Sequence, residues 1–537
     1  MKVRMWIAVV PAVAASMGFA LADDKPAAPR TRPAKVNITI SKETTWITAP
    51  LNPDGTVNYV AYLNAKRNKG VTPENNAAVL LLKALGPKAL DEDKREAILK
   101  ALKVGPLPAD RQYFIRHYEY APTVFPGRGD SEEAMRAAKR IEKSYEKALN
   151  EPILPKDHPE LVEWLRTNER PLSLVRAAVK RPRFFLPLVS RSDPPTMQDT
   201  LLASSMGGTR GAGKAMLVRA MVSAGRGDAG GAMDDLIAIR RLAGHMGRDG
   251  NLIDFLVMTS LDMIASDAVI RLATSGKLPA AQGVRYLRRL QNLPSLPTLT
   301  SIMDGAERIP SLDMIIVFAR EGLDRGLKHL ELTPGQLKSI GLETATDPLP
   351  NVELDWDLML RLANARSDEI IRIGHVRPLA KRRRAFALLR KRIARNWPGV
   401  VTREECEVPW EFRKEIGQAI DSIGTKDQGK LTKAVFEVFF AAGIMERLYV
   451  LQDRARMQRQ LAQVALALAV YKSEHGTYPK TPGGLTPNYL KRIPKDIFTG
   501  QPLIYRREAK GYVLSCLGEN LKDDRGEPDD IVVRAKQ

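Results

Sequence analysis

The chain has 537 residues, of which 44% are hydrophobic and 27% are charged, and its formal net charge is +21. That length suffices for roughly two to four domains with buried cores, and the composition excludes an intrinsically disordered protein. Aromatic residues are sparse at 6%. Since Ala, Leu and Arg are abundant instead, we expect a mainly α-helical protein built from helices packed on helices.

The first 22 residues have the pattern of an export signal. Lys2 and Arg4 form a basic start, an apolar run follows, and Ala20-Leu21-Ala22 is a small-x-small cleavage site. An uncleaved membrane anchor is the alternative, because the apolar run is barely long enough to span a bilayer. We favour removal of residues 1–22 and expect an exported protein in the periplasm or at the cell surface.

Residues 23–69 are expected to form a polar tether followed by a short mixed segment. The tether is rich in Pro and Ala, and residues 36–40 then alternate apolar and polar positions as an edge strand would. Further on, Thr72 and Pro73 match the cap and first position of a helix.

Residues 70–426 are expected to form a multi-helix array, because Pro and Gly punctuate successive helical segments. The part from Ile47 to Pro87, and with it the chain as a whole, resembles secreted planctomycete-type proteins of unknown role. That resemblance implies no activity.

One helical hairpin can be placed within the array. Gly227-Asp228 is followed by Ala232 and Leu236, and an apolar run precedes it. This spacing is similar to the second half of a tetratricopeptide hairpin, although no 34-residue recurrence accompanies it. We interpret the array as helical hairpins that are weakly tetratricopeptide-like, with no peptide groove assigned.

A dense basic run lies on a predicted helix. Its members are Lys381, Arg382, Arg383, Arg384, Arg390, Lys391, Arg392 and Arg395. Such a helix can bind an anionic surface such as phospholipid, cell-wall polymer or lipopolysaccharide. A solvated helix face is the alternative. Nucleic acid is not expected as a partner, because an exported protein rarely meets it.

Short motifs that resemble catalytic sites lack the neighbouring residues and secondary structure that such sites require. The stretch from Gly208 to Lys214 fits the first seven positions of a phosphate-binding loop, but Ala215 stands where a hydroxyl is needed and no strand precedes it. We expect an inter-helix loop there and no nucleotide. Asp355 and Asp357 flank Trp356 as a solvated acidic face would. A hydrolase with scattered residues stays an alternative, and a pocket with two pKa-perturbed carboxylates would favour it.

The last segment, residues 427–537, carries the most specific pattern. A long helix is expected from Leu431 to Glu474, and two short strands are expected at 503–506 and 511–516. From the end of the helix to the first strand, the chain reads Tyr471-Lys-Ser-Glu-His-Gly-Thr-Tyr-Pro479 and later Ile-Pro-Lys-Asp-Ile-Phe-Thr-Gly500.

This order resembles the globular domain of type II secretion major pseudopilins, in which a long helix packs on a small antiparallel sheet. The resemblance implies a small C-terminal α+β domain. It does not imply a pilus, because the helix carries charges such as Lys433 and Glu437 and no apolar stem with a peptidase site precedes it.

The resemblance also implies a calcium site in the acidic tail. Its ligands are Leu514, Asn520, Asp523, Asp524, Asp529 and Asp530. Calcium takes six to eight oxygen ligands, which several acids and carbonyls in one loop can supply. Cys516 and Leu521 depart from the family pattern, and a solvated acidic loop is the alternative. No other cofactor is expected.

Two cysteines, Cys406 and Cys516, are the chain's whole complement, and a bridge between them stays open. We expect a non-enzymatic exported envelope or scaffold protein that has protein partners and a pseudopilin-like module. The alternatives are a binder of anionic membrane or cell-surface polymer through the basic helix, and a hydrolase.

Overall fold

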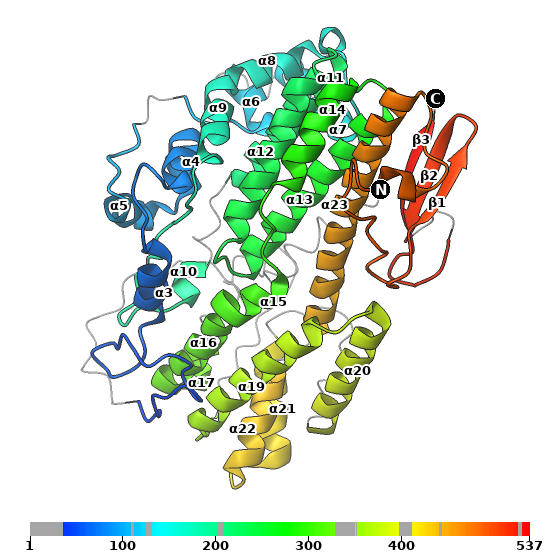
Figure 1. The fold of residues 1–537 in the computed structure, drawn as a ribbon. Helices are drawn as coiled ribbons and strands as arrows, with labels where there is room; N and C mark the ends of the chain where they lie inside the picture. Colours follow the sequence, from blue (N-terminus) through cyan, green and yellow to red (C-terminus); the bar gives the residue numbers. More distant parts are fainter. Residues whose placement is uncertain are drawn as a thin grey trace.

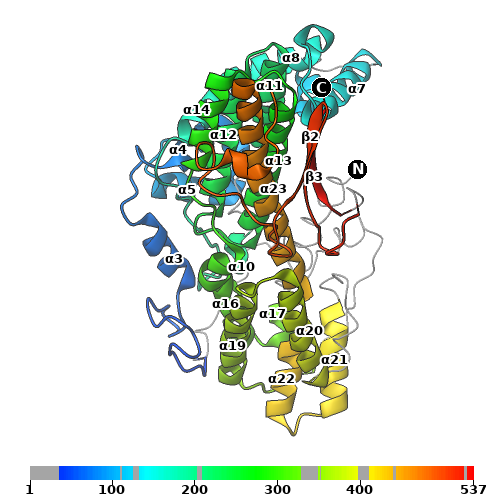
Figure 2. The same ribbon diagram turned by 45° about the vertical axis from the view of Figure 1, so that its right-hand side comes forward.

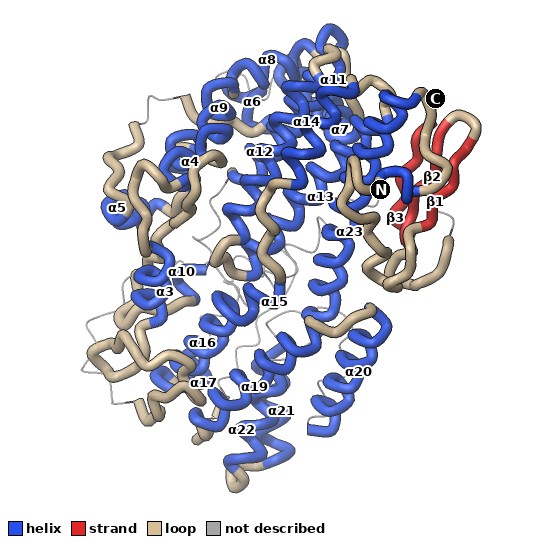
Figure 3. The backbone as a smooth tube through the Cα atoms, in the orientation of Figure 1, coloured by secondary structure: helices blue, strands red, loops and turns tan. Residues whose placement is uncertain are grey.

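The computed structural model describes residues 36–108, 112–124, 132–201, 208–327, 349–350, 352–396, 411–439, 443–524 and 529–536. Over these residues the protein is mainly helical, with a small three-stranded antiparallel sheet close to the C-terminus (Figures 1 and 3). The fold class predicted from composition is confirmed at this level. The predicted export signal lies outside the described residues. Within them, no helix has the length and apolar character that a membrane span requires.

The N-terminal part consists of short helices and the longer α7. They are α3 (Tyr59–Asn68), α4 (Ala77–Leu85), α5 (Glu92–Ala101), α6 (His117–Val124), α7 (Glu132–Asn150), α8 (Pro159–Thr167) and α9 (Glu169–Ala178). Helix α4 begins at Asn76, not at the predicted cap Thr72, because the buried Asn76 side chain accepts from the Ala78 amide at 3.1 Å. Its nearly all-apolar sequence is buried against α9.

The centre is a bundle of long helices. It contains α11 (Thr209–Gly225), α12 (Ala229–Gly247), α13 (Leu252–Thr274), α14 (Ala280–Gln291) and the C-terminal α23 (Gly443–His475). The predicted hairpin is present as α11 and α12, and the Asp228 side chain caps α12 by accepting from the Gly231 amide at 2.8 Å. Gly283 lets α14 lie close to α23, since a Cβ there would stand 2.6 Å from Val470.

The opposite end of the molecule holds a second group of helices (Figure 2). They are α10 (Gln198–Leu201), α15 (Leu299–Ile302), α16 (Arg308–Glu321), α17 (Leu323–Leu327), α19 (Trp356–Gly374), α20 (Leu379–Asn396), α21 (Glu411–Ile423) and α22 (Gln428–Phe439). A turn of π-helix, η3 (Met303–Glu307), joins α15 to α16. A buried ion pair of 2.6 Å between Arg366 and Glu437 holds α19 against α22.

The C-terminal segment partly follows its prediction. Two helices, α22 and α23, occupy the stretch predicted as one, and residues 440–442 between them lie outside the described residues. The sheet contains β1 (Ile504–Glu508), β2 (Gly511–Cys516) and β3 (Ile531–Lys536) in that order, with Leu514 between Tyr505 and Val533. Strand β3 was not expected from the sequence. Because α23 packs along α13 and α14, one hydrophobic core includes residues from Val57 to Ala535.

Candidate functional site

The basic helix α20 divides its arginines between the inside and the outside of the protein. The Arg382 side chain is 0% exposed and pairs with the buried carboxylate of Asp453. Arg390 pairs with Glu446, and Arg392 pairs with Glu369. These pairs fix α20 to α19 and α23.

Arg383 extends this inward set toward the C-terminal loop. Its guanidinium bonds the Glu519 carbonyl and lies 3.6 Å from the Glu519 carboxylate. The prediction that Arg382 belongs to a surface patch is therefore wrong, whereas the Arg383 side chain is 37% exposed. Both positions face neighbouring helices or loops that supply carboxylates, and sequence reading could not see those partners.

The opposite side of α20 faces solvent. Lys381, Arg384, Lys391 and Arg395 are exposed, and none of these four forms an ion pair with another described residue. They recur at intervals of three and four, so they share one side of the helix. Leu388 lies on the same side and is 60% exposed, although most large apolar side chains are buried.

We call these five residues the outer face of α20. The α20 sequence contains no Asp or Glu, so nothing on the helix itself neutralises that face. The helix lies at the edge of the molecule (Figure 1). Four cations around one exposed leucine form a basic amphipathic surface, which can hold an anionic partner while the leucine contacts its apolar part.

A second candidate is a carboxylate pair at the start of α13. Asp254 accepts from the Asn251 amide at 3.1 Å within a capping box, and Glu307 accepts from the Leu252 amide at 3.0 Å. Glu307 is presented by the π-helical turn η3, an irregularity that is often found at functional sites.

The environment of this pair raises both pKa values. Burial raises the pKa of Asp254 to about 6, although the Asn251 amide and Arg67 oppose the shift. Burial and the nearby Asp254 raise the pKa of Glu307 to about 7, against the opposing hydrogen bond from Leu252. Two carboxyls that titrate near neutrality can act as a general acid and base if substrate reaches them.

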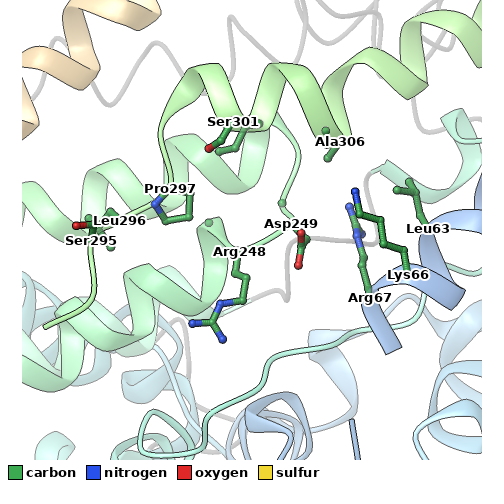
Figure 4. Close-up of a pocket in the computed structure, with 14 residues that line it drawn as sticks. Leu63, Lys66, Arg67, Arg248, Asp249, Ser295, Leu296, Pro297, Ser301 and Ala306 are labelled. Carbon is green, nitrogen blue, oxygen red and sulfur yellow. The ribbon is translucent and has the colours of Figure 1, made fainter. Parts of the chain in front are cut away.

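A cavity of about 290 Å³ lies beside the pair (Figure 4). Lys66, Arg67, Arg248 and Asp249 border it, whereas Asp254 and Glu307 are absent from its lining. The unpartnered Asp254 Oδ1 has no exposed surface. The carboxylates therefore lie behind the wall, where they cap α13, and a ligand in this cavity does not touch them.

The acidic tail brings three of its six predicted ligands, Asn520, Asp524 and Asp529, into contact with one another. Asp529 accepts from the Asn520 amide at 2.8 Å and lies 3.5 Å from Arg454, while Asp524 bonds the Asn520 side-chain amide. Leu514 is buried in β2, and Asp530 is buried at the start of β3. Asp523 lies in the loop before residues 525–528, which are outside the described range.

No group of three or more His, Cys, Asp or Glu side chains in the described ranges is arranged to hold a metal ion. The side-chain oxygen of Asn520 accepts from the Lys522 amide at 2.8 Å, and oxygens of Asp524 and Asp529 accept from nitrogens of Asn520. The calcium site remains a prediction.

The remaining motifs take structural roles. Gly208 caps α11 and the stretch to Lys214 forms its first turns, so the expected loop is a helix start. Asp355 caps α19 through the Leu358 amide, and Asp357 accepts from the Thr39 amide.

Cys516 is a free thiol buried in β2, where burial raises its pKa well above the usual range. Cys406 lies outside the described residues. A bridge between the two cysteines is not formed in the described part of the chain.

Comparisons with family models, curated proteins and solved structures gave no match to this chain. The functional argument therefore depends on the chain's own residues. Sequence reading located the basic helix through its charge density. It missed Asp254 and Glu307, because they lie far apart in the chain and only the fold brings them together.

Proposed function

We propose that this protein is an exported, non-enzymatic envelope scaffold protein that attaches to an anionic surface through the outer face of α20. The observation that carries the proposal is that the basic residues of α20 divide into those that form ion pairs and those that face solvent. Its inward arginines are paired with carboxylates, whereas Lys381, Arg384, Lys391 and Arg395 face outward around Leu388.

The outer face supports reversible attachment. A basic residue near an anionic lipid surface contributes about 1 kcal/mol, and burying one leucine side chain contributes about 2 kcal/mol. Together these give about 6 kcal/mol, equivalent to a Kd on the order of 10–100 µM. That range suits a protein that is retained at a surface without a membrane span, and salt weakens it.

The rest of the molecule supports a scaffold role. Helices α11, α12 and α13 pack side by side as an array of hairpins, which we propose to be weakly tetratricopeptide-like. The long α23 followed by the β1–β2–β3 sheet supports the pseudopilin-like module. Since α23 packs on α13 and α14, the module is part of the body, and we propose that it presents its sheet to protein partners.

The test is a comparison of two variants with the same charge change. The first combines Lys381→Gln, Arg384→Gln, Lys391→Gln and Arg395→Gln. The control combines Lys88→Gln, Lys139→Gln, Lys277→Gln and Lys510→Gln, four exposed lysines on other elements. Sedimentation with phosphatidylglycerol vesicles and retention on heparin are measured at rising salt concentration.

We expect the first variant to bind vesicles or heparin at least tenfold more weakly than the wild type, and the control to change little. Preference for vesicles over heparin indicates a membrane, and the reverse indicates a polymer. An equal loss of affinity in the two variants would show that only net charge matters and would refute a binding role of α20.

A hydrolase is the second candidate, because Asp254 and Glu307 have raised pKa values beside a cavity. This reading requires the wall at Gly250 and Gly305 to open. Hydrolysis of chromogenic glycosides and esters by the wild type, abolished in Glu307→Gln, would support it. Equal rates in the wild type and Glu307→Gln would count against it.

A further inference from the structure

A larger cavity, of about 490 Å³, lies between α13, the segment 290–298 and α23. One side of α23 lines it with a polar stripe at helical spacing. The stripe contains Gln452, Ala455, Arg456, Arg459, Gln460 and Gln463. The volume of the cavity lies within the range of about 300–1,000 Å³ that small-molecule sites occupy. We call it the arginine cleft.

Positive charge dominates the lining. Arg240, Arg377, Arg456 and Arg459 border the cleft, and Asp262 is the single carboxylate among its lining residues. The Asp262 carboxylate is shared between Arg240 at 3.0 Å and Arg459 at 3.7 Å.

Arg377 has to share a partner as well. The carboxylate of Asp453, which lies 3.3 Å from Arg377, is also the partner of Arg382. Burial and the nearby Arg382 and Arg456 lower the pKa of Arg377, and Asp453 opposes them. The guanidinium groups at the cleft therefore outnumber the carboxylates that can neutralise them, and an anion would relieve the excess.

Among the described residues that line the cleft, three buried polar atoms lack a hydrogen bond of good geometry: Arg240 Nε, Asp262 Oδ1 and Gln460 Oε1. The Arg240 side chain is 6% exposed, and its Nε makes no hydrogen bond of good geometry even though Asp262 is near. The Gln460 Oε1 is a buried acceptor without a donor. A buried donor or acceptor left unpaired is costly. The cleft thus holds one buried amide oxygen, Gln460 Oε1, that a ligand hydroxyl can satisfy.

We propose that the arginine cleft binds a small hydroxylated anion, of the class of sugar acids and sugar phosphates. Its anionic group lies against Arg456 and Arg459, and its hydroxyls bond the amides of Gln460 and Gln463. The apolar wall, which includes Phe255, Met258 and Leu296, covers the uncharged face of the ligand. The outer face of α20 takes no part in the lining, so the cleft and the surface attachment are separable.

The experiment measures binding to the full-length protein by calorimetry and thermal shift. The probes are glucuronate, glucose 6-phosphate, inorganic phosphate and glucose. We expect glucuronate or glucose 6-phosphate to bind and raise the melting temperature, and the stronger of the two identifies the anionic group. Glucose, which lacks the charge, should bind at least tenfold more weakly.

Variants on α23 locate the site. Arg456 is exposed and its replacement leaves the core intact, so Arg456→Gln should weaken binding about tenfold. Arg447→Gln changes an exposed arginine of the same helix outside the cleft and should bind as the wild type does. Gln463→Ala should weaken glucuronate more than phosphate.

Three outcomes would overturn the proposal. They are no binding by any probe at millimolar concentration, inorganic phosphate binding as tightly as the hydroxylated anions, and unchanged affinity in Arg456→Gln.

Discussion

Asp313 offers the sharpest test of the core, because its carboxyl is buried and few polar or charged groups offset the cost of burying its charge. It lies in α16, is 4% exposed, and accepts from the Met197 amide at 2.7 Å. The charge of Arg320 opposes this burial, but Arg320 is already paired with Asp54 at 3.0 Å. Burial therefore raises the pKa of Asp313 from 3.8 to about 7.

The sign of the pH dependence follows from that direction. Between about pH 4 and pH 7 the folded protein keeps the Asp313 proton while the unfolded chain releases it. The stability contributed by the protonated carboxyl is complete below pH 4 and is lost as the pH rises through 7. A shift of about three units corresponds to roughly 4 kcal/mol.

Asp313→Asn keeps an acceptor for the Met197 amide and removes the ionisation. Relative to the wild type, we expect it to gain several kcal/mol of unfolding free energy between pH 4.5 and pH 8, up to the 4 kcal/mol estimated above. Urea unfolding followed by circular dichroism at both pH values measures this. Glu96→Gln, at an exposed position of α5, is the control. If Asp313→Asn and Glu96→Gln respond alike to pH, the buried-carboxyl argument is refuted.

Other predictions test packing and the tail. Arg382→Gln removes a charge partner of the buried Asp453 and should destabilise the protein by about 3–5 kcal/mol. Arg384→Gln on the outer face should change the free energy of unfolding by no more than about 0.5 kcal/mol. Urea unfolding midpoints compare the two variants, and equal effects would contradict the assignment of Arg382 to the core and Arg384 to the surface. Gly283→Ala places a methyl group 2.6 Å from Val470 and should cost about 1–3 kcal/mol, whereas Gly105→Ala, where a Cβ would meet no atom within 4 Å, should cost little. For the acidic tail, a calcium site predicts a higher melting temperature of the full-length protein in millimolar calcium than in chelator, and Asp524→Asn should abolish the difference; an unchanged melting temperature leaves a solvated acidic loop.

The sequence revealed the parts of the fold that local patterns encode. Helical periodicity and low aromatic content predicted a helical protein, and the Gly227-Asp228 pair predicted the α11–α12 turn, where Asp228 caps the second helix. Strand β3 escaped prediction because Ile531–Lys536 directly follows an acidic loop. It forms a strand because it pairs with β2, and that tertiary pairing cannot be read from the local sequence.

The site was less predictable because its residues gain their properties from tertiary partners. Charge density alone located the run Lys381 to Arg395, yet it could not separate Arg382, paired with Asp453, from Arg384, which faces solvent. The arginine cleft had no sequence signal. Arg240 on α12 and Arg456 on α23 are far apart in the chain and meet only because both helices pack on α13.

The central claim is that the outer face of α20 contacts an anionic surface, and hydrogen exchange of the unmodified protein tests it most directly. Exchange of the α20 peptides is measured with phosphatidylglycerol vesicles, with neutral vesicles and without vesicles. We expect slower exchange across α20 with anionic vesicles alone, and no change in α5 on another part of the molecule. Binding of the vesicles with unchanged exchange in α20 and new protection elsewhere would contradict the account.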